Sequence, residues 1–253
     1  MKYPKEINIP TETVKETTST NDYLAKLCKE NKAKEFHTVI AENQTAGKGQ
    51  RGNTWESENN KNLTFSIVLY PTALEAKQQF NLSMLAALSC HDALSHYTEG
   101  FSIKWPNDIY WNDRKIGGIL IENELEGKYI MQSIIGIGIN VNQEVFHSDA
   151  PNPVSLKQIL GVEVDLQELF AKVIHGIVGG YRQLETHFDT TQQAIGILYR
   201  KHLYRHEGLF PYRDAQGEFL AEYQAIEPDG HLILKDEQGT LRRYAFKEVS
   251  FIL

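Results

Sequence analysis

The amino-acid sequence predicts an α+β protein with a small all-β unit at its C-terminal end. Three strand-like segments follow one another closely between residues 101 and 142, which is typical of an antiparallel sheet. Segments with apolar residues at helical spacing stand before and after them. From about residue 204, five short β-like runs are separated by glycine-containing turns, which is typical of a small barrel. We therefore expect two domains, residues 1–203 and residues 204–253.

The N-terminal part is predicted to begin irregularly and then to alternate helix and strand. Ser19 or Thr20 can cap a short amphipathic helix. Residues 37–42 and 63–70 are predicted strands, the second of them rich in branched and aromatic residues. Residues 43–62 between them have no apolar periodicity. An irregular segment of this length inside a compact domain is more often a functional loop than a neutral connection.

The central and C-terminal elements follow from the same patterns. Residues 75–97 carry a single apolar stripe and are predicted to be helical. The predicted central strands are 101–105, 109–124 and 129–142, with turns near residues 112 and 126. Asp165 is predicted to cap a long helix, and a further helix is expected to include residues 195–203.

Composition excludes several classes of protein. The 253 residues include 26 Lys and Arg against 33 Asp and Glu, so no general positive field attracts nucleic acid or anionic membranes. Cys28 and Cys90 are too few and too far apart for a disulfide framework, and the histidines form no zinc-binding pattern. No signal peptide or run of 18 apolar residues is present. We expect a cytoplasmic protein without nucleic-acid or membrane partners.

The irregular segment contains the sequence A-E-N-Q-T-A-G-K-G-Q-R-G-N-T-W, which includes the pattern G-x-G-x-x-G. A dinucleotide-binding site requires a helix directly after the glycines, but polar residues and a strand follow here. A kinase-type loop is excluded as well, because the chain has neither H-R-D nor D-F-G.

The same loop interleaves glycine with cations. Lys48 and Arg51 can neutralise an anion, and Trp55 offers a flat stacking surface. The glycines permit close approach of the backbone to a ligand. The loop therefore suits a phosphate or a carboxylate, although an ordinary solvated surface loop would have similar residues.

A second candidate constellation is I-K-W-P-N-D-I-Y-W-N-D-R-K-I-G-G-I-L-I-E. Asn107 and Asp108 offer oxygen ligands at the tip of a turn, and Lys115 lies on the returning strand three residues before Gly118. The pattern places a cation, a carboxylate and bare backbone close together. The alternative is a simple hairpin with turn-favouring residues.

The third constellation is I-I-G-I-G-I-N-V-N, in which Gly136 and Gly138 alternate with isoleucine. Two glycines on one face of a strand indicate that a ligand or another backbone packs against that face. Asn140 ends the face with an amide. Close packing of a helix on the strand is the alternative explanation.

Taken together, these segments resemble biotin–protein ligases over nearly the whole chain. The resemblance is carried, in order, by S-T-N at residues 19–21, Q-T-A-G-K-G-Q-R-G-N-T-W, K-W-P-N-D with D-R-K-I-G-G-I-L, G-I-G-I-N and the β-rich C-terminal end. It implies a mixed β-sheet catalytic domain flanked by helices, related to lipoate ligases, and a small C-terminal SH3-like β-barrel. It also implies that ATP, with Mg²⁺, and biotin form biotinyl-5'-AMP, from which a lysine of a biotin carboxyl carrier domain takes the biotin. The protein is expected to be a monomer or a homodimer.

The resemblance also implies roles for individual residues. Those expected to bind biotin are Ser19, Thr20, Asn21, Gln44, Lys48, Gly49, Gln50, Lys115, Gly118, Gly136 and Gly138. Those expected on the ATP side are Arg51, Trp55, Asn107 and Asn140. Lys48, Asp108 and Lys115 are the expected catalytic residues, and Asp108 is also the candidate metal ligand.

The chain departs from the family pattern at two places. Gln50 stands where an arginine often closes over the adenylate, and no helix-turn-helix segment precedes Ser19. Two other functions remain open at this point: a lipoate–protein ligase with the same adenylation chemistry, and a non-catalytic biotin-binding regulator.

Overall fold

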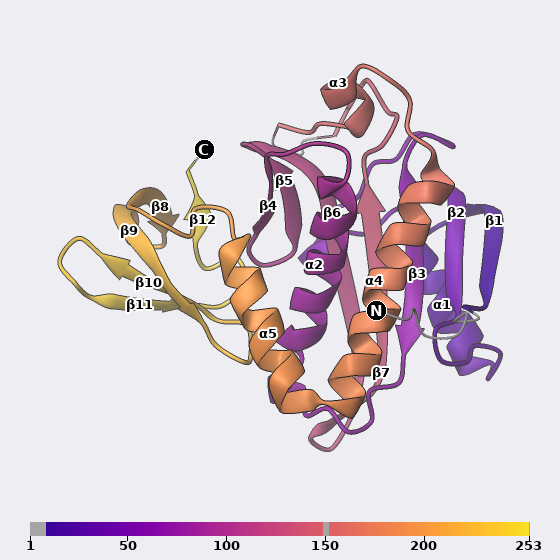
Figure 1. Cartoon of the computed structure of the whole chain (residues 1–253), viewed down its shortest axis with the longest axis horizontal. Helices are drawn as coiled ribbons and strands as arrows, with labels where there is room; N and C mark the ends of the chain where they lie inside the picture. Colours follow the sequence, from indigo (N-terminus) through magenta and orange to yellow (C-terminus); the bar gives the residue numbers. More distant parts are fainter. Residues whose placement is uncertain (1–8, 149–151, 253) are drawn as a thin grey trace.

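The computed structural model describes residues 9–148 and 152–252. A seven-stranded sheet with helices on both faces forms the larger part, and a five-stranded antiparallel sheet lies at the C-terminal end (Figure 1). The predicted fold class, a mixed sheet flanked by helices with a second small β unit, is therefore confirmed.

The large sheet has the strand order β1-β2-β3-β7-β6-β5-β4. Its strands are β1 (Thr11–Thr17), β2 (Thr38–Gln44), β3 (Leu63–Leu69), β4 (Phe101–Lys104), β5 (Asp108–Trp111), β6 (Arg114–Glu126) and β7 (Tyr129–Ile139). β1 pairs with β2 in parallel, while every other neighbouring pair is antiparallel, so the sheet is mixed. The predicted irregular start is wrong where β1 forms. Because Val14 is the only aliphatic residue of this edge strand, backbone pairing with β2 rather than side-chain pattern defines it.

The helices are α1 (Thr20–Lys29), α2 (Phe80–Ser95), α3 (Leu156–Leu160), α4 (Leu166–Thr186) and α5 (Phe188–Lys201), with short 3₁₀ turns η1 (Gln50–Gly52) and η2 (Ala76–Gln78). Ser19 is the N-cap residue of α1, and Asp165 caps α4 by accepting hydrogen bonds from two backbone N–H groups. The predicted cap by Asp165 is confirmed, whereas Ser19 occupies the N-cap position without a capping hydrogen bond from its side chain. In the described part of the chain, no helix is long and apolar enough to cross a membrane.

The two faces of the large sheet carry different layers. α2 and α4 cover one face over the main apolar core, and α1 lies on the other, where Leu24 packs with Val39, Val68 and Ile134 (Figure 1). In the second half of β7, Ile135, Ile137 and Ile139 belong to the main core, so the alternating Gly136 and Gly138 face the α1 side. This side is therefore open beside α1, and the functional cavity lies there.

The C-terminal sheet contains β8 (Phe210–Asp214), β9 (Gly217–Ile226), β10 (Leu232–Asp236), β11 (Leu241–Tyr244) and β12 (Ser250–Phe251), in the order β11-β10-β9-β8-β12. The two sheets share one apolar core. The Trp105 indole donates a hydrogen bond to the Gly230 carbonyl at 2.9 Å, and Phe246 packs against both Trp105 and Phe80. The domain boundary at residue 203 stays a prediction.

Candidate functional site

A cavity of about 890 Å³ lies on the α1 side of the large sheet. Its wall is built from the start of α1, the loop after β2, the β4–β5 turn, strands β6 and β7, and the segment containing β12. The predicted site residues that line it are Ser19, Thr20, Asn21, Gln44, Lys48, Gly49, Gln50, Trp55, Asn107, Asp108, Lys115, Gly118, Gly136 and Gly138. Residues separated by up to about 120 positions in the sequence thus meet in one cavity.

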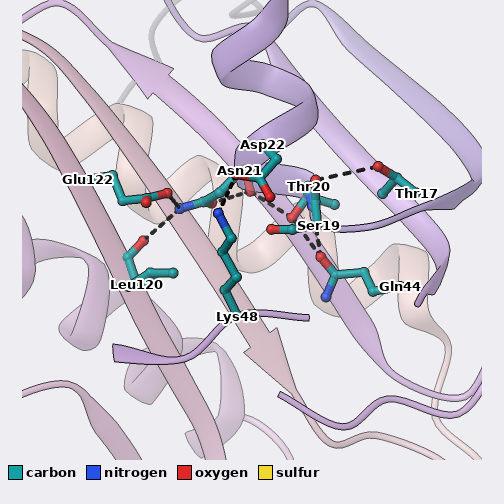
Figure 2. Close-up of polar contacts among 10 residues, drawn as sticks. Thr17, Ser19, Thr20, Asn21, Asp22, Gln44, Lys48, Leu120 and Glu122 are labelled. Atoms are coloured by element: carbon teal, nitrogen blue, oxygen red, sulfur yellow. Dashed lines mark hydrogen bonds and ion pairs between the residues drawn. The ribbon is translucent and has the colours of Figure 1, made fainter. Parts of the chain in front are cut away.

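A network of short polar side chains occupies the end of the cavity beside α1 (Figure 2). Gln44 Oε1 accepts hydrogen bonds from the Thr20 backbone N–H at 2.8 Å and from its hydroxyl at 3.2 Å. The buried Ser66 hydroxyl lies 2.7 Å from Thr20 Oγ1 and 2.6 Å from Asn21 Oδ1. Because each group is fixed by a neighbour, the network presents donors and acceptors in set directions.

The position of Asn21 accounts for the glycine at residue 136 of β7. Its Nδ2 donates to Glu122 Oε2 at 2.7 Å (Figure 2), and its side chain lies directly over Gly136. A Cβ atom added at Gly136 would be only 2.3 Å from Asn21 Oδ1. The space left by this glycine is therefore filled by a polar side chain of α1, so the alternative explanation, close packing of a helix on the strand, applies to Gly136.

The position of Trp55 accounts for the glycines at residues 118 and 138. Gly118 and Gly138 are direct cross-strand partners, and the indole of Trp55 lies over both. An added Cβ would come within 2.4 Å of the ring at Gly138 and 3.3 Å at Gly118. Within the described structure, the buried Nε1–H of Trp55 has no hydrogen-bond partner. The two glycines thus form a flat floor for an aromatic ring that reaches the sheet from the long loop.

An ion pair stands next to this floor. Lys115 Nζ lies 2.6 Å from Asp108 Oδ1, and both side chains are largely buried. Asp108 and Gly118 face each other across β5 and β6, and the bulge between Ile109 and Tyr110 shifts the register so that Lys115 turns toward the same place. Asp108 is the only carboxylate among the described residues that line the cavity.

The glycine loop is attached to α1 by a second ion pair. Lys48 Nζ is paired with Asp22 Oδ1 (Figure 2), and this hydrogen bond raises the pKa of the lysine. Within the loop, the Gly49 N–H donates to the Asn53 carbonyl at 2.7 Å and the Trp55 N–H to the Gly47 carbonyl at 2.8 Å. The loop therefore lies across the cavity. The side chain of Arg51 is outside the described residues.

The two asparagines predicted on the ATP side differ in their position relative to the cavity. Asn107 lines the cavity, and its amide donates to the Ile119 carbonyl at 2.7 Å. Asn140 does not line it. The Asn140 amide is buried and donates to the Val154 carbonyl at 3.2 Å, so in this structure it supports the segment after residue 152. The role of Asn140 on the ATP side stays a prediction.

Sequence reasoning missed four polar residues of this region, namely Ser66, Glu122, Asp22 and Lys104. Ser66 had a detectable signal, because a serine stands there in a predicted strand of mostly branched and aromatic residues. Asp22 and Glu122 had none, since single carboxylates on a helix and a strand are common on surfaces. Lys104 lines the cavity at the end of β4.

Comparison with known proteins identifies the family. The model of the biotin/lipoate A/B protein ligase family matches residues 13–140, which includes α1, the glycine loop and the sheet strands of the cavity. The chain belongs to this family. The family match agrees with the resemblance carried by the sequence motifs.

Two proteins of this family are similar to this chain over much of its length. It is 30% identical over 224 residues to the bifunctional ligase/repressor BirA of Bacillus subtilis, covering 85% of this chain and 66% of that protein, so it spans just under two thirds of the relative's length. It is 34% identical over 158 residues to the biotin–[acetyl-CoA-carboxylase] ligase of Paracoccus denitrificans, covering 59% of this chain and 64% of that one.

A solved structure extends the likeness to the C-terminal sheet. The biotin protein ligase from Aquifex aeolicus in complex with biotin and ATP has a TM-score of 0.77 and 26% identity, over 95% of this chain and 97% of that chain. The whole arrangement of two sheets therefore matches the biotin protein ligase fold.

Proposed function

We propose that this protein is an ATP-dependent biotin–protein ligase. It forms biotinyl-5'-AMP from biotin and ATP and then transfers biotin to a lysine of a biotin carboxyl carrier domain. The observation that carries the proposal is the joining, in one cavity, of a directional polar network, an aromatic plate on a glycine floor and a lysine–carboxylate pair. Residues 1–203 would form the catalytic domain and residues 204–253 the barrel.

The polar network suits the ring end of biotin. A cyclic urea carries two N–H donors and one carbonyl acceptor, so it needs acceptors and donors at fixed positions. Gln44, Asn21 and the hydroxyl of Thr20 offer both kinds of group at one end of the cavity. The apolar remainder of biotin would then extend along the cavity toward Lys115.

The chemistry requires cations where two anions meet. A carboxylate oxygen of biotin attacks the α-phosphorus of ATP, and negative charge spreads over the phosphate oxygens in the transition state. The ammonium group of Lys115, fixed by Asp108, is held in a largely buried position where its charge is poorly screened. Trp55 would provide the stacking surface for the adenine ring. Lys48 closes the cavity from the loop side.

Asp108 fits a role as ligand for the magnesium ion that accompanies ATP. Mg²⁺ in nucleotide sites is commonly bound by one or two carboxylates together with substrate phosphates and water. Asp108 supplies one carboxylate, and Asn107 lies beside it at the tip of the same turn. When bound, the ion would neutralise phosphate charge. Lys115 would then share Asp108 with it.

The defining experiment combines the protein with labelled biotin, ATP, Mg²⁺ and a biotin carboxyl carrier domain. We expect label on one carrier lysine, and none when ATP is omitted or that lysine is replaced by arginine. A parallel incubation with lipoate and a lipoyl domain is the matched control. Transfer of lipoate alone would identify the protein as a lipoate ligase. Binding of biotin without adenylate or transfer would identify a non-catalytic binding protein.

We predict that residues 46–53 become more protected from hydrogen exchange when biotin and ATP are both bound. Three glycines make this loop entropically costly to order, so ligand contacts are needed to hold it. Exchange is measured by mass spectrometry, with β7 as an internal reference because it lies inside the sheet. Equal protection of the loop in the free and the liganded protein would contradict its closure over the adenylate.

We also predict that Gln50→Arg slows the release of biotinyl-5'-AMP. Gln50 lines the cavity, and a guanidinium there could pair with the adenylate phosphate, whereas a neutral amide makes only ordinary hydrogen bonds. The difference of about 1 kcal/mol corresponds to roughly a fivefold slower release. Release of labelled adenylate is followed after dilution without carrier. Gln216→Arg adds the same charge in an exposed turn as a control. Identical rates for wild type and Gln50→Arg would mean that this position does not govern retention.

A further inference from the structure

Lys104 is a largely buried cation of the cavity that has no role in the proposed function above. It ends β4, and its side chain lies in the cavity wall. Lys48 and Lys115 each form an ion pair with a carboxylate. Among the described residues, no carboxylate forms an ion pair with Lys104. Two aromatic rings hold it instead. Nζ lies 5.0 Å from the ring centre of Tyr110 and 4.9 Å from that of Phe251.

This environment keeps the lysine available for an anion. Cation–π contacts fix the position of an ammonium group without neutralising its charge. Burial lowers the pKa of Lys104, and the nearby charges of Lys115 and Arg205 act in the same direction, while Asp108 opposes them. A buried charge that lacks a counter-ion is costly, and a bound anion would remove that cost.

The sheet register places Lys104 at one end of a row of site residues. Lys104 is paired with Asp108 across β4 and β5, Asp108 with Gly118 across β5 and β6, and Gly118 with Gly138 across β6 and β7. Side chains at such paired positions point to the same face of a sheet. A ligand that starts at the polar network beside α1 therefore meets Trp55 on the glycine floor first, then the Asp108–Lys115 pair, and Lys104 last.

We propose that Lys104 binds the β- and γ-phosphates of ATP and holds the pyrophosphate as it leaves. This inference rests on the proposed ligase function and adds a residue to it. In the adenylation step, a biotin carboxylate oxygen bonds to the α-phosphorus, the bond from that phosphorus to the α–β bridging oxygen breaks, and the electron pair stays on pyrophosphate. Negative charge therefore grows beyond Lys115, in the direction of Lys104.

The same geometry gives the C-terminal sheet a part in the site. Phe251 belongs to β12, which pairs with β8, while Tyr110 belongs to β5 of the large sheet. Lys104 lies between the two rings, so the position of its ammonium group depends on both sheets. Phe251 is thus a positioning residue for the phosphate-binding cation.

The test compares Lys104→Met with Lys104→Arg and with the control Lys77→Met, which removes an exposed lysine. Methionine keeps the length and apolar stem of the side chain but removes the charge. We expect Lys104→Met to raise the KM for ATP and the inhibition constant of pyrophosphate by about tenfold or more, as for loss of one charge-assisted contact. Biotin affinity should be unchanged, and Lys104→Arg should recover much of the pyrophosphate affinity.

Each other result has a definite meaning. Unchanged ATP and pyrophosphate constants in Lys104→Met would overturn the inference. Equal losses of biotin and pyrophosphate affinity, with a lower melting temperature, would assign Lys104 a structural role and overturn it as well. A loss of biotin affinity alone would mean that Lys104 binds the biotin carboxylate, and this result would also overturn the inference. Failure of the wild-type protein to use ATP would refute the ligase proposal itself, before Lys104 is considered.

A measurement on the unmodified protein covers the case in which Lys104→Met does not fold. Acetic anhydride acetylates uncharged amines, and the extent of modification at each lysine is read by mass spectrometry. We expect magnesium pyrophosphate to protect Lys104 at least about threefold, while biotin alone does not, and Lys77 should react equally in both samples. Equal modification of Lys104 with and without pyrophosphate would overturn the proposal.

Discussion

Replacement of Lys115 by alanine is expected to lower the rate of biotinyl-5'-AMP formation by a factor on the order of 10²–10³. The ammonium group of Lys115 is the cation held closest to Asp108 in the cavity, and no other described lysine pairs with that carboxylate. The measurement is pyrophosphate release in a single turnover with biotin and ATP. The biotin dissociation constant, measured in parallel, should change much less than the rate.

The control for this prediction is Lys128→Ala. Lys128 is also ion-paired, with Glu75 at 2.9 Å, but it is exposed and lies at the turn between β6 and β7. Removal of Lys115 leaves a largely buried carboxylate without its partner, so the melting temperature of Lys115→Ala is measured as well, to separate this stability effect from catalysis. Adenylate formation at the wild-type rate in Lys115→Ala would refute the assigned role.

Gly136→Ala is expected to weaken biotin binding by roughly 10- to 100-fold and to lower the free energy of unfolding by about 1–3 kcal/mol. The added Cβ would lie 2.3 Å from Asn21 Oδ1, and Asn21 is buried and bonded to Ser66 and Glu122. The side chain therefore cannot move aside without breaking the polar network. Calorimetric titration with biotin and thermal unfolding measure the two effects.

Gly196→Ala is the matched control, because a Cβ added there meets no described atom within 4 Å. Gly196 lies in α5, where alanine is favoured over glycine. This variant should bind biotin normally and be at least as stable as the wild type. If Gly136→Ala also bound biotin normally, the glycine would not be required by the polar network, and the role of Asn21 in biotin binding would be in doubt.

Most of the fold could be predicted from the sequence because its signals are local. The apolar runs of β3 and β7 and the Asp165 cap of α4 each follow from side-chain pattern alone. The helix α2 was predicted with a single apolar stripe, but it is buried around most of its circumference, including Asn81, Ser89 and His91. β1 could not be found in this way, since its strand character comes from pairing with a neighbour and not from its own residues. The first turn of the predicted helix at residue 75 is instead the 3₁₀ turn η2, where Glu75 and Gln78 form a capping box.

Site residues that lie within a continuous sequence motif could be predicted. Contacts between segments that are distant in the sequence could not. The predicted glycines, Lys115, Asp108 and Trp55 all line the cavity. What fills the space over each glycine could not be predicted, because Asn21 and Trp55 reach β7 from elements more than 80 residues away in the sequence. Asn140 illustrates the opposite case. It follows a glycine-rich strand directly, yet its amide is used by the Val154 carbonyl.

The contact between the two sheets limits how independently they can change. Trp105 follows Lys104 directly and is anchored to the Gly230 carbonyl, while Phe246 packs on Trp105 and Phe80. A Cβ at Gly230 would lie 2.8 Å from the Phe80 ring. A chimaera that takes the C-terminal sheet from another protein must therefore match the turn at Gly230 and the aromatic residue at 246 to this particular helix and tryptophan. The C-terminal sheet therefore cannot be exchanged between proteins without also matching the residues that it packs against.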